Sequence, residues 1–307
     1  MSIFDKYPRS SFLSELTASP HVIDIAHRIA ELFSALDGLE DPNFGAELDA
    51  DPQSRIWEMM VSKILKDSGF PVLGSNGDGP DFTVFHRGKK IVVEAICPTH
   101  GEDGLPDSVP PLFPGPDYQE VPIDQMLLRI RGAIRDKKLV FDRYRAKGII
   151  SSDDLCVIAI SSSKIDRARG YSPCLGVTAT IGHGGPYAVF DSRTKECIKE
   201  GFLLKENVRK ANGSLVDTLP FLDDGNASIA GILYSEASVY SLNYDLTEET
   251  YFIHNPKAPH CIPAQTFKVG HELWTVLSTG GDAWATYSTK MAFSVDRSIK
   301  ALVAATS

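Results

Sequence analysis

The chain has 307 residues, 43% of them hydrophobic, and a formal net charge of -9, which is an ordinary composition for a protein with a large core. No apolar run approaches the roughly 18 residues of a membrane span, and the opening MSIFDKYPRS lacks the apolar segment of a signal peptide. These features predict a cytoplasmic protein and argue against an indiscriminate nucleic-acid binder. The five cysteines form no C-x-x-C pair, so neither a zinc site nor a dithiol site is indicated.

Two helical regions are predicted in the first part of the chain. Residues 11–37 carry an apolar stripe that is interrupted near Pro20, and residues 54–68 carry a second one. Between them, residues 38–53 are acidic and turn-rich, which predicts a connecting loop. Glu58 lies on the flank of the second stripe. It either points toward a neighbouring sheet or is a solvent-exposed helix acid, and the pattern leaves both open.

A β-hairpin is predicted over residues 81–96, because both halves are rich in β-branched and aromatic residues and Arg87-Gly88 suits a two-residue turn. Counting outward from that turn places Asp81 opposite Glu94. Directly opposed like charges, about 5 Å apart, destabilise a strand pair unless something compensates. The register therefore predicts a divalent-cation site. The alternatives are a longer turn, which would send one acid to the other face, or two exposed acids at the strand ends.

The most informative helix is predicted over residues 123–147, which carry eight basic residues. Lys137 falls in the middle of the apolar stripe, so it either extends to the rim of the interface or is buried against carboxylates such as those of the hairpin. A basic face that includes Arg131, Arg135 and Lys138 is what a phosphate backbone requires. A solvated charged face without a ligand explains such a run equally well.

Further strands are predicted after this helix, at residues 155–160, 187–190, 228–234 and 250–253. His254 precedes Asn255-Pro256, which is most simply a turn. The alternative is that His254 lies at the edge of the active site. Together the elements predict a single α/β domain with a central mixed β-sheet flanked by helices.

The order of these motifs resembles the restriction-endonuclease-like superfamily, named for its PD-(D/E)xK motif. Glu58 on a helix, Pro80-Asp81 and then Glu94 on the next strand follow that pattern. The segments RIWEMM, GPDFTVF, VVEAICP, AIRDKK and FIHNPKAPH resemble a set of bacterial proteins of unknown function with the same pattern. Ile96 stands where the motif has its lysine, and Lys137 is the candidate for a lysine moved to a neighbouring helix.

The resemblance implies a restriction-endonuclease-like core and Mg²⁺-dependent hydrolysis of phosphodiester bonds in nucleic acid, with DNA favoured over RNA. Asp81, Glu94 and Glu58 would hold Mg²⁺, or Mn²⁺ in its place, and Lys137 would complete the catalytic set. Two alternatives stay open: an inactive nuclease-fold protein that binds nucleic acid or another protein, and a hydrolase of small phosphoesters. A homodimer is a further expectation, because nucleases that cut both strands frequently pair. The implied organisation of residues 1–307 is an N-terminal helical extension (1–53), a catalytic core (54–165) and a part that completes the sheet (166–307).

Overall fold

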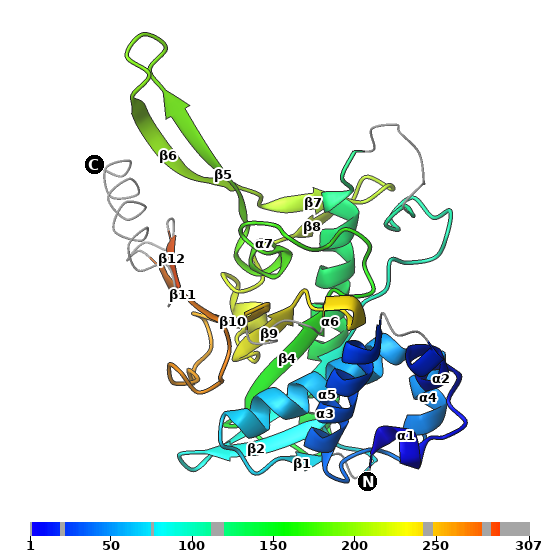
Figure 1. The fold of residues 1–307 in the computed structure, drawn as a ribbon. Helices are drawn as coiled ribbons and strands as arrows, with labels where there is room; N and C mark the ends of the chain where they lie inside the picture. Colours follow the sequence, from blue (N-terminus) through cyan, green and yellow to red (C-terminus); the bar gives the residue numbers. More distant parts are fainter. Residues whose placement is uncertain are drawn as a thin grey trace.

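We describe the fold from a computed structural model, in which residues 2–18, 22–74, 77–111, 120–241, 248–277 and 284–288 are described. Within these ranges an eight-stranded mixed sheet has the strand order β1-β2-β3-β4-β9-β10-β11-β12, and helices cover it (Figure 1). The predicted α/β class with a central mixed sheet is therefore confirmed. The strands of this sheet are β1 (Leu73–Gly74), β2 (Phe82–His86), β3 (Lys89–Ile96), β4 (Leu155–Ser161), β9 (Gly231–Ser235), β10 (Thr250–His254), β11 (His271–Leu277) and β12 (Trp284–Ser288).

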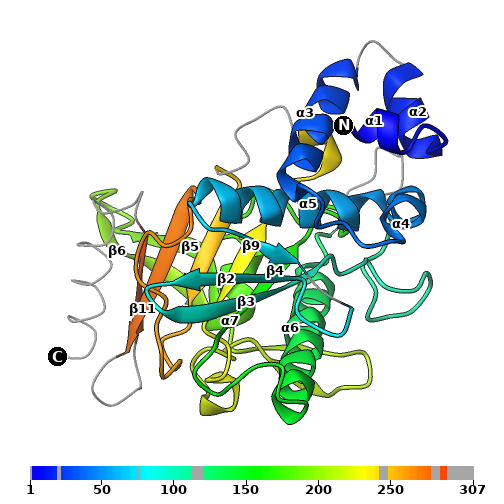
Figure 2. The same ribbon diagram turned by 90° about the horizontal axis from the view of Figure 1, so that it is seen from below.

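Different helices cover the two faces of the sheet (Figure 2). One face carries α5 (Pro52–Asp67) with α3 (Ile23–Leu36) packed on it, and the other carries α6 (Ile123–Ala146) and α7 (Leu175–Ile181). No helix among the described residues combines the length and the apolar character needed to cross a lipid bilayer.

Strand β3 shows which face each of its side chains meets. Side chains alternate between the two faces of a strand. Ile91, Val93 and Ala95 belong to the hydrophobic cluster under α5, and Val92 belongs to the cluster under α6. Glu94 has the same parity as Val92, so its carboxylate is directed to the α6 face.

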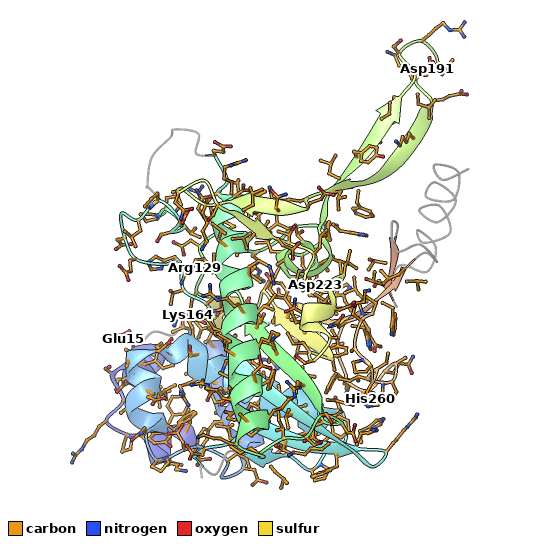
Figure 3. All side chains as sticks on the ribbon, turned by 180° about the vertical axis from the view of Figure 1, so that it is seen from behind. Glu15, Arg129, Lys164, Asp191, Asp223 and His260 are labelled. Atoms are coloured by element: carbon orange, nitrogen blue, oxygen red, sulfur yellow. The ribbon has the colours of Figure 1, made fainter. Side chains whose placement is uncertain are left out.

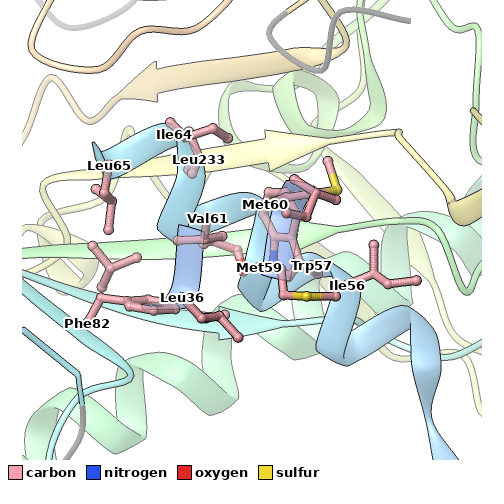
Figure 4. Packing of buried hydrophobic residues seen from close by; sticks show 14 of the residues in the cluster. Leu36, Ile56, Trp57, Met59, Met60, Val61, Ile64, Leu65, Phe82 and Leu233 are labelled. Carbon is pink, nitrogen blue, oxygen red and sulfur yellow. Dashed lines mark hydrogen bonds between the residues drawn. The ribbon is translucent and has the colours of Figure 1, made fainter. Parts of the chain in front are cut away.

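Helix α5 begins two residues before the predicted start at residue 54. The Asp51 carboxylate accepts a hydrogen bond from the backbone N–H of Ser54, and Pro52 occupies the first turn, where its missing N–H costs nothing. Figure 4 shows the apolar side of the helix seated on the sheet. The Trp57 indole N–H also donates to the carbonyl of Ala159 on β4 at 3.0 Å, so this helix is fixed relative to the centre of the sheet.

The N-terminal region contains more helix than the sequence pattern predicts. Besides α1 (Ile3–Lys6) and α2 (Ser11–Ala18), a helix α4 (Phe44–Ala50) lies within the predicted loop 38–53. That prediction was wrong. Phe44 and Leu48, one turn apart, are buried, and their contacts outweigh the acidic, turn-rich composition of the segment. The predicted break near Pro20 falls at residues 19–21, outside the described residues.

The β2–β3 hairpin has the predicted register. His86 pairs with Lys89 across the two-residue turn, and Phe82 pairs with Val93. Arg87 and Gly88 have φ values of 48° and 77°, as a type I′ turn requires at both central positions. The alternative of a one-residue slip is therefore excluded. From β3 the chain crosses through α6 to β4, which runs parallel to β3.

Two small sheets lie outside the central one. Strands β5 (His183–Phe190) and β6 (Cys197–Leu204) form a hairpin that projects from the body of the molecule (Figure 1), and β7 (Asn207–Arg209) pairs with β8 (Leu215–Asp217). The part after residue 165 therefore completes the central sheet only through β9 to β12. The predicted strand 187–190 belongs to the projecting hairpin instead.

Candidate active site

Asp81, Glu94 and Lys137 come together beside the end of β3. The Lys137 ammonium lies 2.6 Å from Glu94 Oε2 and 3.8 Å from Asp81 Oδ2. The Asp81 carboxylate also accepts a hydrogen bond from the backbone N–H of Ala95 at 2.7 Å, which holds it across from Glu94. The three side chains thus come from the start of β2, from β3 and from α6, as their predicted positions require.

Tyr144 is a fourth member of this cluster that sequence reasoning missed. Its hydroxyl lies 2.9 Å from Glu94 Oε1 and 2.9 Å from the carbonyl oxygen of Gly79, so its single proton is donated to one of these two acceptors. Seven residues separate Tyr144 from Lys137, which places both on one face of α6. That spacing, within the same apolar stripe, was the signal available in the sequence.

Negative charge exceeds positive charge in the cluster. Glu94 is 2% exposed, and the Asp81 side chain retains 34% exposure. Burial, followed by the nearby charge of Glu94, raises the pKa of Asp81 to about 6 against the opposing effect of Lys137. Two carboxylates therefore share one ammonium group, and one of them remains accessible from solvent.

Glu58 lies near the cluster but does not join it. It sits on α5, which covers the face of the sheet opposite to the one that Glu94 faces, and its carboxylate accepts a hydrogen bond from Arg55 at 2.7 Å. Burial raises the pKa of Glu58 to about 8, with smaller contributions from Arg55, which lowers it, and from Asp81, which raises it. Among the described residues, no three His, Cys, Asp or Glu side chains are grouped closely enough to hold a metal. As placed, Glu58 is held by Arg55 beside the predicted metal site, and its role as a ligand stays a prediction.

A cavity of about 380 Å³ opens next to Glu58, where β3 and β4 end. Its volume lies within the range of small-molecule sites. Lys164, which follows β4, pairs with Asp51 at 2.5 Å on its wall. Its lining includes Ala95 and Ile96 of β3 but not Asp81, Glu94 or Lys137. Its charged and backbone lining includes Glu47, Asp51, Arg55, Glu58, Ala95 and Lys164.

The three residues of α6 that were predicted to contact nucleic acid differ in their exposure to solvent. The Arg131 side chain is 13% exposed, and its Nε–H donates to the backbone carbonyl of Asp217 at 2.6 Å. Arg131 is thus bound within the protein, and its predicted phosphate contact does not agree with this position. Lys138 pairs with Asp142 at 2.9 Å, and Arg135 is 67% exposed. Much of the basic character of this helix is therefore neutralised by neighbouring acids.

His254 lies far from the cluster. Its Nε2 is 2.8 Å from the Glu272 carboxylate, its ring stacks on Trp274, and both His254 and Glu272 are buried. β10, which carries His254, is separated from β3 by β4 and β9. His254 ends β10 and belongs to the packing between β10 and β11, so a place at the edge of the site does not describe it. The predicted turn follows directly, because the backbone N–H of Ala258 donates to the carbonyl of Asn255 at 3.2 Å.

No family model, curated protein or solved structure matches this chain. The chemistry of the site therefore has to be judged from its own residues. Asp81 and Glu94 offer hard oxygen donors with surplus negative charge, and Mg²⁺ is typically held by one or two carboxylates with waters completing its shell. The two residues fit such an ion. Both oxygens of Glu94 already have partners. A bound ion would therefore either share Glu94 with Lys137 or displace the Lys137 ammonium from it.

Proposed function

We propose that this protein is a Mg²⁺-dependent nuclease with a restriction-endonuclease-like core, which hydrolyses phosphodiester bonds of nucleic acid, with DNA favoured. The observation that carries the proposal is the distance of 2.6 Å between Lys137 Nζ and Glu94 Oε2. Lys137 of α6 reaches the two carboxylates, although Ile96 stands where the PD-(D/E)xK motif has its lysine. The opposed acids and the relocated lysine supply the three charged groups that the PD-(D/E)xK pattern calls for.

Each side chain has a role that follows from its contacts. Asp81 and Glu94 would hold Mg²⁺, which lowers the pKa of a bound water and neutralises charge that develops on the phosphate. Lys137, close to both acids, would orient the attacking water or stabilise the negative charge of the transition state. Tyr144 fixes the orientation of Glu94. The Asp81 side chain, which is 34% exposed, leaves the cluster accessible to a substrate.

A cleavage assay with purified protein tests the proposal. Labelled single-stranded and double-stranded DNA and RNA are incubated with Mg²⁺, with Mn²⁺ and with EDTA, and the Asp81→Ala and Glu94→Ala variants serve as controls. Cleavage should need the metal and should be lost in both variants while their circular dichroism spectra stay unchanged. Equal cleavage by wild type and variants would refute the assignment, because a contaminating nuclease would then account for the activity.

The competing function is a non-catalytic nuclease-fold protein that binds nucleic acid or another protein. Two observations favour it: both oxygens of Glu94 are already bound by α6 side chains, and Glu58 is held by Arg55. A protein of this kind would show neither Mn²⁺ binding in calorimetry nor turnover. The same calorimetric titration therefore separates the two functions.

A further inference from the structure

A buried glutamate that takes no part in the candidate active site lies at the end of β9. Glu236 directly follows this strand and is 8% exposed. One oxygen of its carboxyl group, Oε2, accepts a hydrogen bond from the backbone N–H of Gly170 at 2.9 Å. The other oxygen, Oε1, is buried and has no hydrogen-bond partner among the described residues. Gly170 belongs to the segment between β4 and α7, residues 162–174, which is called the β4–α7 loop below.

The charges around Glu236 do not compensate a buried carboxylate. Arg169 acts on it from the β4–α7 loop, but Arg169 is paired with Glu249, which precedes β10. The other titratable groups near Glu236 are phenols and a thiol that are neutral at pH 7, and these are Tyr171, Cys174, Tyr234 and Tyr251. An ionised Glu236 would therefore share its cation with a second carboxylate, and a charge of this kind is strongly disfavoured in a protein interior.

The protonation of Glu236 is coupled to the closure of the loop over it. Burial, the largest cause, raises the pKa of Glu236 from 4.5 to about 7, against the opposing effects of the Gly170 hydrogen bond and of Arg169. In an opened loop the carboxyl group is in water, and its pKa returns toward 4.5. The closed loop thus binds the proton more tightly than the open loop does. Rising pH therefore favours opening, increasingly between about pH 4.5 and 7, with no further change above that range.

The β4–α7 loop is held differently along its length. Near its start, Lys164 (labelled in Figure 3) pairs with Asp51 at the N-terminus of α5, and the next residue, Ile165, is buried. Residues 169 and 170 are exposed, and their contacts with the acids beside β9 and β10 join this part of the loop to the sheet. Segments with few buried apolar contacts open at a lower free energy than the core. Release of Glu236 should therefore open residues 169–173 and leave the start of the loop in place.

We propose that Glu236 is a proton-dependent anchor, which holds residues 169–173 of the β4–α7 loop against the sheet when it is protonated and releases them when it is ionised. The unpartnered oxygen explains the direction of the effect. Because Oε1 is buried in the closed loop, an ionised carboxylate is hydrated only when the loop moves away from it. This inference does not depend on the proposed nuclease activity.

Hydrogen exchange of the full chain at pH 5.5 and pH 7.5 tests the proposal. The exchange rates of the amides of residues 169–172, divided by their intrinsic rates at each pH, measure how often this segment opens. Amides of β4, at the centre of the sheet, serve as the reference for global unfolding. Relative to that reference, the wild-type segment should open about tenfold or more often at pH 7.5 than at pH 5.5. In Glu236→Gln, which keeps an acceptor for Gly170 and carries no charge, this pH dependence should be lost.

The matched control is Asp166→Asn, which converts an exposed acid of the same loop to its amide and should keep the full pH dependence. A second variant, Glu249→Gln, leaves Arg169 free to pair with Glu236 and should therefore reduce the pH dependence. Circular dichroism spectra that match the wild type at pH 5.5 show that the variants are folded.

The proposal is overturned by a wild-type segment that opens equally often at both pH values, or by a change that β4 shares to the same extent. A pH dependence that persists undiminished in Glu236→Gln or in Glu249→Gln overturns it as well. So does its loss in Asp166→Asn, because the charge of the loop as a whole, and not the buried carboxyl group, would then be responsible.

Discussion

Replacement of Lys137 by methionine tests the candidate site most directly. Met has a similar length and apolar stem, so the change removes the ammonium group and leaves the packing of α6 nearly intact. Glu94 is 2% exposed and lies 2.6 Å from that ammonium. Without it, a buried carboxylate loses its charge partner next to a second carboxylate, Asp81. Breaking a buried pair in this way costs about 3–5 kcal/mol.

The expected loss is large enough to measure by thermal unfolding. For a chain of this size, about 3–5 kcal/mol corresponds to a fall in Tm of roughly 5–8 °C. The control is Lys138→Met, one residue further along the helix. Lys138 pairs with Asp142 at 2.9 Å, but the two side chains are 27% and 43% exposed, and surface pairs of this kind contribute about 0–1 kcal/mol. Its Tm should therefore fall by no more than about 2 °C.

A double-mutant cycle separates the charge interaction from other effects of the substitution. When Glu94→Gln accompanies Lys137→Met, the more buried carboxylate loses its charge together with its partner, and only the partly exposed Asp81 stays charged, so most of the lost stability should return. The coupling free energy should exceed about 2 kcal/mol. Added Mg²⁺ should also raise the Tm of Lys137→Met more than that of the wild type, because the ammonium no longer competes with the ion. If Lys137→Met costs no more than Lys138→Met, Lys137 does not compensate the two acids and the proposed site is refuted.

Further predictions concern metal binding, followed by calorimetric titration with Mn²⁺. Asp81→Asn keeps an acceptor for the backbone N–H of Ala95 but removes the charge, so Mn²⁺ affinity should fall at least tenfold; an unchanged affinity would exclude Asp81 as a ligand. Because the pKa of Asp81 is raised to about 6, the proton competes with the ion, and Mn²⁺ affinity should rise about tenfold per pH unit below pH 6 and level off above it. A profile that is flat from pH 5 to 7 would contradict this assignment. Tyr144→Phe should lower stability by about 1–3 kcal/mol, since a partner of Glu94 is lost, and should also weaken Mn²⁺ binding; denaturant unfolding that matches the wild type would argue against its role. Glu58→Gln should change Mn²⁺ affinity less than about threefold, since Arg55 holds that carboxylate, and a tenfold loss would return Glu58 to the ligand set.

Local patterns in the sequence predicted the part of the fold that positions the site. The hairpin register followed from a two-residue turn, because side-chain alternation has a period of two and a defined turn leaves no freedom to slip. The place of Lys137 in an apolar stripe of a long helix predicted either the rim of the interface or a contact with the hairpin carboxylates, and the structure has the contact. Such inferences succeed where the nearest neighbours in sequence determine the geometry.

Relations between distant elements could not be obtained in the same way. The pattern placed Glu58 on a helix flank, but which face of the sheet that helix covers depends on the packing of the whole chain. α5 and α6 lie on opposite faces, so Glu58 and Glu94 are directed into different layers. The projecting β5–β6 hairpin was missed for a related reason. Its strand at residues 187–190 alternates like a strand of the main sheet, and nothing local indicates that its apolar side chains find no cover within the described chain.

The geometry of α6 explains how the lysine can be absent from β3 without loss of the charged cluster. Lys137 and Tyr144 are seven residues apart, nearly two full turns, so their side chains leave the helix in the same direction about 10 Å apart along its axis. Both reach Glu94, one at each carboxylate oxygen. A helix that holds one carboxylate through two side chains has its rotation about its own axis fixed relative to β3. The ammonium is thereby directed between Glu94 and Asp81.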